Sequence, residues 1–425
     1  VQAESPRRRL ARRPTQPPDM SSATESASID IKRYDRQIRL WGLETQTGLH
    51  GARILLLRAT GLCNEIAKNL VLAGVGHVSI HDAGVVEQQD IDTGAVFYFS
   101  KADIGRGRAE VLAEGLRALN PSVDISVLTE ELRDLGADGL KRFSYIIGTH
   151  GAGAIADLVA CTDMLEAPTS DAPPPSKKAR ASGAEADPPL PRKNSNGADV
   201  VLPRRPAEAM PKLMAAGVLG MHGFCIIDLH TQEYQPPPKS AKAGEADVSA
   251  SSSVDPPLTK RLSALYPSVQ HAMAVDWSAL APRVPPFYCA LQLLCDLQEH
   301  VKAPAGQATG TPEARLAWLE QRRQQKLAEA QRPEAWLSAS SVAQVARHAD
   351  AELAPVCAIV GGVVASEVIK IISGKGAPIN NAFFFDALQT SEGSVQRLGP
   401  SYSCPWGNDA GKPRELGGIP MANLV

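Results

Sequence analysis

The residues with the clearest chemical meaning lie in the stretch Ala52–Lys68, which reads ARILLLRATGLCNEIAK. Its first apolar residues are typical of a buried strand, and the apolar spacing from Leu62 onward is typical of a helix. A turn between such elements can bind a phosphate when the glycines of a G-x-G-x-x-G pattern let the backbone approach the anion. Here the turn, residues 58–63, reads RATGLC, and only Gly61 remains. Either the match is accidental or this nucleotide-binding scaffold no longer binds nucleotide, and the rest of the chain favours the second interpretation.

Asp82 is another candidate for the same site. It ends a predicted strand, at the position where an acid binds the ribose hydroxyls in dinucleotide-binding folds. An aspartate that closes a strand is also a common turn residue. Asp82 alone therefore does not decide between the two interpretations.

The elements that would position these residues alternate between strand and helix. The predicted strands are Ala52–Leu57, His77–His81, Val123–Leu128, Tyr145–Thr149, Lys212–Val218, Gly223–Leu229 and Ala382–Asp386. Helical patterns cover Leu62–Ala73, Arg106–Leu119, Met273–Leu297, Glu313–Arg347 and Ala358–Ile372. In the last of these, Gly361 and Gly362 would allow a neighbouring helix to approach closely. The alternation predicts an α/β fold, with βαβ units and a mainly parallel sheet that has helices on both faces.

Three parts of the chain are predicted to carry this fold. They are residues 29–167 as its N-terminal part, 207–234 as its continuation, and 271–400 as a helical segment with the C-terminal part. Residues 168–206 are rich in Pro, Ser, Ala and charge, which predicts a disordered insertion. The polar stretch 235–270 is predicted to be a linker or loop.

The two ends of the chain are expected to be tails. Residues 401–425 are assigned to a C-terminal tail. Residues 1–28 are Arg-rich at their start and lack the apolar region of a secretory signal, so a disordered tail is expected. A transit peptide, or an extension upstream of Met20, remains an alternative.

Composition argues against several classes of partner. Lys plus Arg (44) nearly balances Asp plus Glu (46), so no overall field attracts nucleic acid. No apolar run is expected to reach the roughly 20 residues that cross a bilayer. The seven cysteines form no CxxC pair, which favours buried, reduced thiols in an intracellular protein over a zinc or redox site.

Three longer strings carry a resemblance to one family. Arg33–Gly42, RYDRQIRLWG, and Ile104–Glu110, IGRGRAE, followed by LNP at Leu119–Pro121, resemble the eukaryotic enzymes that activate ubiquitin-like modifiers. Ala354–Asp386, APVCAIVGGVVASEVIKIISGKGAPINNAFFFD, and AVDW at Ala274–Trp277 are similar to the small subunits of SUMO-activating enzymes. The resemblance implies a Rossmann-like adenylation fold, shared with the bacterial enzymes ThiF and MoeB, here with disordered insertions and a helical subregion.

The resemblance also implies a heterodimer whose two subunits have different roles. The large subunit of such a heterodimer holds ATP, Mg²⁺, a structural Zn²⁺ and the catalytic cysteine. It adenylates the C-terminal glycine of SUMO and then carries the modifier as a thioester. The small subunit would complete the adenylation site, bind no cofactor of its own and meet SUMO only through the complex.

Measured against an active adenylating half, this chain has lost four parts of the site. The glycine-rich turn is degraded, and residues 92–97, DTGAVF, lack the basic group that faces the phosphates in active relatives. Arg108 replaces the expected catalytic lysine, a substitution that keeps the charge but not the compact ammonium. The magnesium-binding aspartate is absent from residues 150–153. The expectation is that Gly61, Asp82 and Arg108 are vestigial and that the chain binds no productive ATP.

Arg36 is the candidate catalytic residue that remains. In the family, the arginine of the YDRQ string reaches across the dimer to the phosphates in the partner's ATP site, and a guanidinium suits that role because its charge is permanent and its donor fork is planar. The structural alternative is that Arg36 and Arg39 pair with acids on a surface helix. Tyr34, Leu40 and Trp41 are expected to anchor the segment.

The other reactive residues favour structural roles. Cys357 lies among small apolar residues and is expected to be a buried thiol, while Cys161 and Cys225 lack the partners of a thioester cysteine. His222 is expected to be a buried structural histidine. The basic clusters SPRRRLARR, SKKAR, PRK and PRR could direct nuclear import, although solvated linker charge is nearly as good an account.

Three alternatives to the SUMO assignment stay open from sequence. One is the small subunit of an activating enzyme for another ubiquitin-like modifier, which would share RYDRQIRLWG. A second is a self-sufficient homodimeric enzyme like ThiF or MoeB, which would need intact glycines, a catalytic lysine and CxxC pairs. The third, a Rossmann oxidoreductase, conflicts with the lost glycines.

Overall fold

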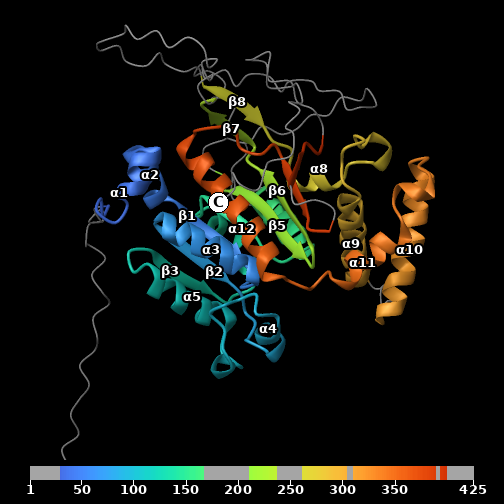
Figure 1. The fold of residues 1–425 in the computed structure, drawn as a ribbon, viewed down its shortest axis with the longest axis horizontal. Helices are drawn as coiled ribbons and strands as arrows, with labels where there is room; N and C mark the ends of the chain where they lie inside the picture. Colours follow the sequence, from blue (N-terminus) through green and yellow to red (C-terminus); the bar gives the residue numbers. More distant parts are fainter. Residues whose placement is uncertain (1–28, 167–209, 237–260, 304–309, 389–392, 400–425) are drawn as a thin grey trace, which may run out of the picture.

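An eight-stranded sheet runs through the centre of the described part of the chain, which comprises residues 29–166, 210–236, 261–303, 310–388 and 393–399 of a computed structural model (Figure 1). Its strands are β1 (Arg53–Leu57), β2 (His77–His81), β3 (Asp124–Leu128), β4 (Tyr145–Gly148), β5 (Lys212–Leu219), β6 (His222–Asp228), β9 (Ala382–Asp386) and β10 (Gly393–Gln396), in the order β10-β9-β6-β5-β4-β1-β2-β3. β3, β2, β1, β4 and β5 are parallel neighbours, and the other three add antiparallel. The parallel half has the strand order of a Rossmann fold, which confirms the predicted α/β class.

The central parallel strands β1, β4 and β5 are apolar along nearly their whole length because helices cover both of their faces. β1 reads RILLL and is buried after its first residue, and β2 is buried throughout.

The helices are α1 (Asp35–Trp41), α2 (Leu43–Gly51), α3 (Gly61–Ala73), α4 (Gln88–Thr93), α5 (Arg108–Leu119), α6 (Leu132–Leu140), α7 (Gly153–Glu166), α8 (Val269–Met273), α9 (Pro286–Lys302), α10 (Pro312–Glu329), α11 (Ala339–Arg347) and α12 (Ala354–Ser373).

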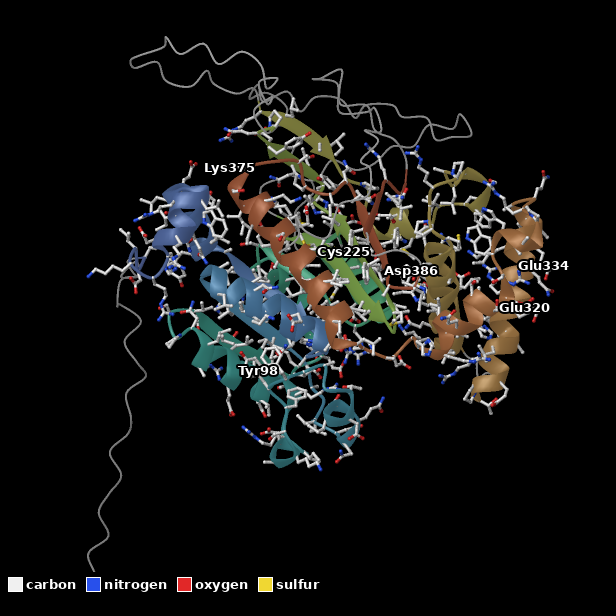
Figure 2. All side chains as sticks on the ribbon, viewed as in Figure 1. Tyr98, Cys225, Glu320, Glu334, Lys375 and Asp386 are labelled. Carbon is white, nitrogen blue, oxygen red and sulfur yellow. The ribbon has the colours of Figure 1, made fainter. Side chains whose placement is uncertain are left out.

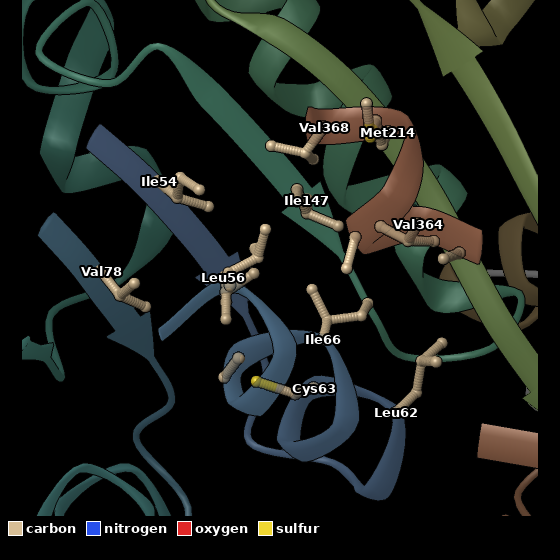
Figure 3. Close-up of a cluster of buried hydrophobic side chains, with 14 of the residues drawn as sticks. Ile54, Leu56, Leu62, Cys63, Ile66, Val78, Ile147, Met214, Val364 and Val368 are labelled. Carbon is tan, nitrogen blue, oxygen red and sulfur yellow. The ribbon is translucent and has the colours of Figure 1, made fainter. Parts of the chain in front are cut away.

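One face of the sheet is covered by α3, α5 and α12. Figure 3 shows Ile66 of α3 and Val364 of α12 gathered with Leu56 and Ile147 of the strands in one buried cluster. The two helices approach closely at Gly361, where an added Cβ would lie 2.7 Å from the Cβ of Glu65. The close approach that was predicted for this glycine is confirmed.

α12 corrects one expectation from composition. It is long and apolar enough to cross a membrane by length and composition alone. In the described structure it packs against α3 and the sheet, and more than half of its apolar window is buried. A core helix that contacts neighbours on most sides is apolar around its circumference, so its composition resembles that of a membrane span.

The opposite face is covered by α7, α8 and α9. α10 and α11 pack outside α9 (Figure 1). The helical pattern predicted over Glu313–Arg347 forms two helices, because Pro333 interrupts it between α10 and α11. The pattern over Met273–Leu297 is likewise divided, and α9 begins at Pro286, a favourable first residue for a helix.

Two further differences from the predictions concern loops. The stretch 235–270 was expected to be a linker, but Leu262–Leu265 forms β8, which pairs with β7 (Thr231–Tyr234). The short strand has only weak alternation, so the pairing rather than the local sequence defines it. The predicted disordered tail at 1–28, the insertion at 168–206 and the tail at 401–425 lie outside the described residues.

Candidate functional site

A cavity of about 610 Å³ opens at the carboxyl ends of β1 and β4, beside the N-terminus of α3. Thr60, Gly61, Arg108 and His150 line its sheet side, and leucines of α9 and α10 line the other side. In open α/β sheets, ligands bind at this edge. The cavity therefore includes Thr60 and Gly61 of the degraded turn, at the place where a nucleotide would bind in a dinucleotide-binding fold.

The turn into α3 adopts a glycine-like backbone conformation at a position where glycine has been lost. Arg58, at the position of the first glycine, has a φ of 75°, which is a left-handed conformation that favours glycine. Its N–H donates to the carbonyl of His81. Thr60 caps the helix, since its hydroxyl accepts a hydrogen bond from the Cys63 N–H at 3.2 Å. The turn thus has a left-handed residue at the first glycine position and a capped helix start, although its residues have changed.

The carboxylate of Glu352 occupies the end of this helix. It accepts a hydrogen bond of 2.5 Å from the Gly61 N–H and one of 3.3 Å from the Leu62 N–H. These are the free donors that bind anions at a helix N-terminus, where the helix dipole also favours negative charge. Burial raises the pKa of Glu352 to about 7, although the two backbone hydrogen bonds oppose that shift. Sequence reasoning missed Glu352, because an acid before α12 has no local pattern that links it to the turn.

Gly61 is the one glycine present in this turn, and the arrangement requires it. A Cβ at position 61 would lie 2.5 Å from the Cβ of Ala95 and 2.9 Å from a carboxylate oxygen of Glu352. The retained glycine therefore serves the internal carboxylate and the packing of the loop after α4.

Asp82 and Arg108 form an ion pair with each other in the same site. The Asp82 carboxylate accepts hydrogen bonds from the N–H groups of Ala59 (2.9 Å) and Gly84 (2.7 Å) and pairs with the Arg108 guanidinium at 3.2 Å. Burial opposes ionisation, but these hydrogen bonds and the charge of Arg108 outweigh it and hold the pKa of Asp82 below its ordinary value. Arg108 also lies 3.8 Å from Asp90. Both of these residues, which the sequence predicts to be vestigial, are thus engaged with neighbours in this chain.

The residues present do not fit a nucleoside triphosphate. The Glu352 side chain stands where phosphate oxygens would bind and already accepts hydrogen bonds from the Gly61 and Leu62 N–H groups that a phosphate would need. His150 lies where the metal-binding aspartate was expected, and burial, helped by the charge of Arg58, lowers its pKa, which favours the neutral ring. Among the described residues, no cluster of three or more His, Cys, Asp or Glu side chains could hold a metal ion.

Arg36 lies at the other end of α3. The Tyr34 ring packs against Gly74, the residue that follows α3, so that an added Cβ there would meet the ring at 2.6 Å. α3 has 13 residues and therefore spans about 20 Å from this end to the cavity. Arg36, two residues after Tyr34, is exposed and has no hydrogen-bond or ion-pair partner among the described residues. Arg39 does pair with Asp35, at 3.0 Å, so the alternative of a surface ion pair describes Arg39 but not Arg36.

The residues around Arg36 anchor the segment unequally. Tyr34 is 5% exposed and Trp41 is half-buried, so both anchor it as predicted. The prediction for Leu40 is wrong, since 79% of this residue is exposed. Lys375, which follows α12, donates to the carbonyl of Trp41 at 2.7 Å and lies beside this end of the molecule in Figure 2.

The remaining reactive residues have structural surroundings. Cys225 lies in the middle of the sheet (Figure 2), and burial raises the pKa of its thiol and that of Cys357 far above the ordinary range. Burial likewise raises the pKa of Cys161 to about 12. His222 is buried, stacks on the Phe287 ring and lies 3.6 Å from Asp386, which agrees with its predicted structural role.

Comparison with known proteins gives matches along most of the chain. The sequence pattern of the ThiF family matches residues 34–405. SUMO-activating enzyme subunit 1 of Bos taurus is 30% identical over 391 residues, which cover 88% of this chain and 96% of that protein. The Homo sapiens subunit 1 is 30% identical over 389 residues, or 87% and 96% of the two chains. A shorter match, 41% identical over 120 residues, covers 28% of this chain and 38% of the DNA damage tolerance protein rad31 of Schizosaccharomyces pombe.

Proposed function

This chain belongs to the ThiF family, and on that premise we propose that it acts as the small subunit of a heterodimeric SUMO-activating enzyme. The similarity to subunit 1 of such enzymes, over nearly the whole length of both proteins, supports this assignment over an activating enzyme for another modifier. The partner in this proposal is a catalytic large subunit, which holds ATP, Mg²⁺ and a structural Zn²⁺, and SUMO binds through the complex.

The role proposed for this chain is to complete the partner's adenylation site with Arg36. The observation that carries the proposal is the contrast between the two ends of α3. At one end Glu352, Asp82 and Arg108 are engaged with groups of this chain. At the other end Arg36 is exposed and has no partner among the described residues. An exposed guanidinium without a partner can neutralise phosphate charge on a neighbouring molecule. Arg36 lies about one length of α3 away from the cavity of its own chain.

The same contrast disfavours a self-sufficient adenylating enzyme. Such an enzyme would need the α3 N-terminus free for phosphate, and the Glu352 carboxylate accepts hydrogen bonds from two of its N–H groups. We infer that the chain is not catalytic alone. A nuclear location is also part of the proposal, and it rests on the basic clusters of the sequence, all of which lie outside the described residues.

SUMO-dependent exchange between ATP and pyrophosphate tests the proposal. The samples are this chain alone, this chain with a SUMO-activating large subunit, and the same complex with Arg36→Ala or Arg39→Ala. We expect no exchange by the chain alone, exchange by the complex, and a loss on the order of 100-fold for Arg36→Ala with unchanged dimerisation. Arg39→Ala is the matched control, because it removes an arginine one turn away whose ion pair lies within α1.

Two outcomes would overturn parts of this proposal. Exchange by the chain alone would contradict the non-catalytic role. Equal activity of the Arg36→Ala complex and the unmodified complex would leave the subunit with a role in binding its partner but not in the chemistry. Replacement of SUMO by another ubiquitin-like modifier in the same assay tests the choice of modifier.

A further inference from the structure

The C-terminal end of α3 is capped by side-chain amides. The last carbonyls of a helix have no partner within it and are left for water or side chains. Here three successive carbonyls each accept a hydrogen bond from an amide N–H. The bonds join Asn120 to Val71 (2.8 Å), Gln37 to Leu72 (3.2 Å) and Gln46 to Ala73 (2.9 Å). Because Gln37 belongs to α1 and Gln46 to α2, this cap fixes both helices on the end of α3.

Asn120 is the centre of this arrangement. Besides the bond to Val71, its amide donates to the Tyr34 hydroxyl at 2.9 Å, and its oxygen accepts from the Arg33 guanidinium at 2.5 Å and from the Ser122 N–H at 3.2 Å. Asn120 is 2% exposed. An asparagine has two donor hydrogens and an oxygen with two lone pairs, so every hydrogen-bonding position of this side chain is used.

The bonds from Asn120 reach the two residues that precede α1. Tyr34 is the last residue before the helix, and Arg36 lies in its first turn. The ring of Tyr34 is buried against Gly74, and its hydroxyl is oriented by Asn120. The starting point and direction of α1 are therefore set by a buried contact between residues that are 86 positions apart.

We propose that Asn120 is the positioning residue for Arg36: through Tyr34, it fixes the first turn of α1 so that the guanidinium is presented to the partner's ATP site. The inference rests on the proposed function. An arginine side chain has considerable rotamer freedom, and a misplacement of about 1 Å in a catalytic group can cost about 100-fold in rate. Because Tyr34 is held against α3, the displacement of Arg36, and with it the loss of rate, is limited. The proposal also gives a role to the Asn of the LNP string, which the adenylation chemistry leaves unexplained.

Tyr34→Phe is the sharpest variant for the test. It removes a single oxygen, leaves the ring against Gly74, and breaks only the hydrogen bond between Asn120 and Tyr34, while the bond between Asn120 and Arg33 can remain. Asn120→Asp is the second variant, since it loses both N–H donors but keeps an oxygen toward Arg33. Tyr98→Phe is the matched control, because the Tyr98 hydroxyl makes no hydrogen bond with the described residues and lies on the loop after α4.

The readout is ATP–pyrophosphate exchange by the complex with a SUMO-activating large subunit, as kcat and as KM for ATP. Dimerisation and thermal unfolding are measured on the same samples. For Tyr34→Phe we expect a three- to tenfold lower kcat with dimerisation retained, for Asn120→Asp a larger loss, and for Tyr98→Phe no change. In a background that already carries Arg36→Ala, Tyr34→Phe should have no further effect, because the two residues act as one unit.

The double variant separates the possible failures. If Tyr34→Phe lowers kcat by the same factor with and without Arg36, the residues act independently and the positioning role is overturned. An unchanged kcat for Tyr34→Phe and Asn120→Asp would overturn it as well. If Arg36→Ala itself leaves exchange intact, the proposed function fails at the arginine, and any effect of Tyr34→Phe then has another cause.

Discussion

The Glu352 carboxylate lies 2.5 Å from the backbone nitrogen of Gly61, although 291 positions separate the two residues in the chain. The contact joins the first strand–helix unit of the fold to the segment that leads into α12. It also places a carboxyl group at the positive end of α3, on the N–H donors that would otherwise be free to bind a phosphate. α3 is thus capped by an acid at one end and by three amides at the other, and both caps come from elsewhere in the chain.

The stability of the protein should depend on the protonation of Glu352. Burial raises its pKa in the folded state to about 7 from an ordinary value of 4.5. Between these pH values the folded state holds a proton that the unfolded state has released, so this residue makes the free energy of unfolding fall as the pH rises from about 4.5 to about 7. The full effect is at most on the order of 3 kcal/mol.

Glu352→Gln removes this titration. Denaturant unfolding of both proteins at pH 5, 6, 7 and 8 should show the stability of the wild type falling relative to that of the variant as the pH rises. Stability curves that stay parallel across this range would show that Glu352 has the same pKa in the folded and unfolded chains.

Removal of the Glu352 carboxylate should make the protein responsive to small anions. Glu352→Ala leaves two N–H groups at the α3 N-terminus without their acceptor, at a cost of roughly 1–3 kcal/mol. Inorganic phosphate can supply oxygens at that position. We expect phosphate to raise the unfolding temperature of the variant more than that of the wild type, compared with sodium chloride at equal ionic strength. Identical responses of the two proteins would contradict this account of the helix end.

Gly61→Ala should destabilise the protein by roughly 1–3 kcal/mol, because the new methyl group would overlap the Ala95 Cβ and crowd Glu352. Gly51→Ala is the matched control, since nothing lies within 4 Å of a Cβ at the end of α2. Thermal unfolding of the two variants measures the difference. Equal unfolding temperatures would mean that the loop around Ala95 moves away at little cost.

Leu40→Ser should leave the stability of the isolated chain within about 0.5 kcal/mol of the wild type, because the Leu40 side chain is largely in solvent. Leu49→Ala, in the fully buried position of the neighbouring helix α2, should cost about 2–5 kcal/mol. Denaturant unfolding of the chain without a partner compares them. A large loss for Leu40→Ser would restore the anchoring role that the sequence suggested for this residue.

Much of the fold follows from patterns within short stretches. The apolar run of β1 and the helical spacing of α3 predict their elements to within a few residues, because burial imposes its period on neighbouring positions. The short strand β8 was missed, since four residues with weak alternation resemble a loop. Leu40 was misassigned for a related reason: an apolar residue within a characteristic string does not reveal whether its side chain faces the core or the solvent.

The sequence alone determined that this is an α/β chain of Rossmann type, that its phosphate-binding turn is degraded, and that Arg36 lies in a string typical of modifier-activating enzymes. The tertiary structure decided what fills the degraded turn and what orients the arginine. Glu352 meets Gly61, and Asn120 meets Tyr34, only after the chain has folded the intervening strands and helices into place. The free N–H and carbonyl groups at helix ends require partners, but any suitable side chain can satisfy them. Local sequence therefore specifies the need for a partner, and the packing of distant segments selects the residue that supplies it.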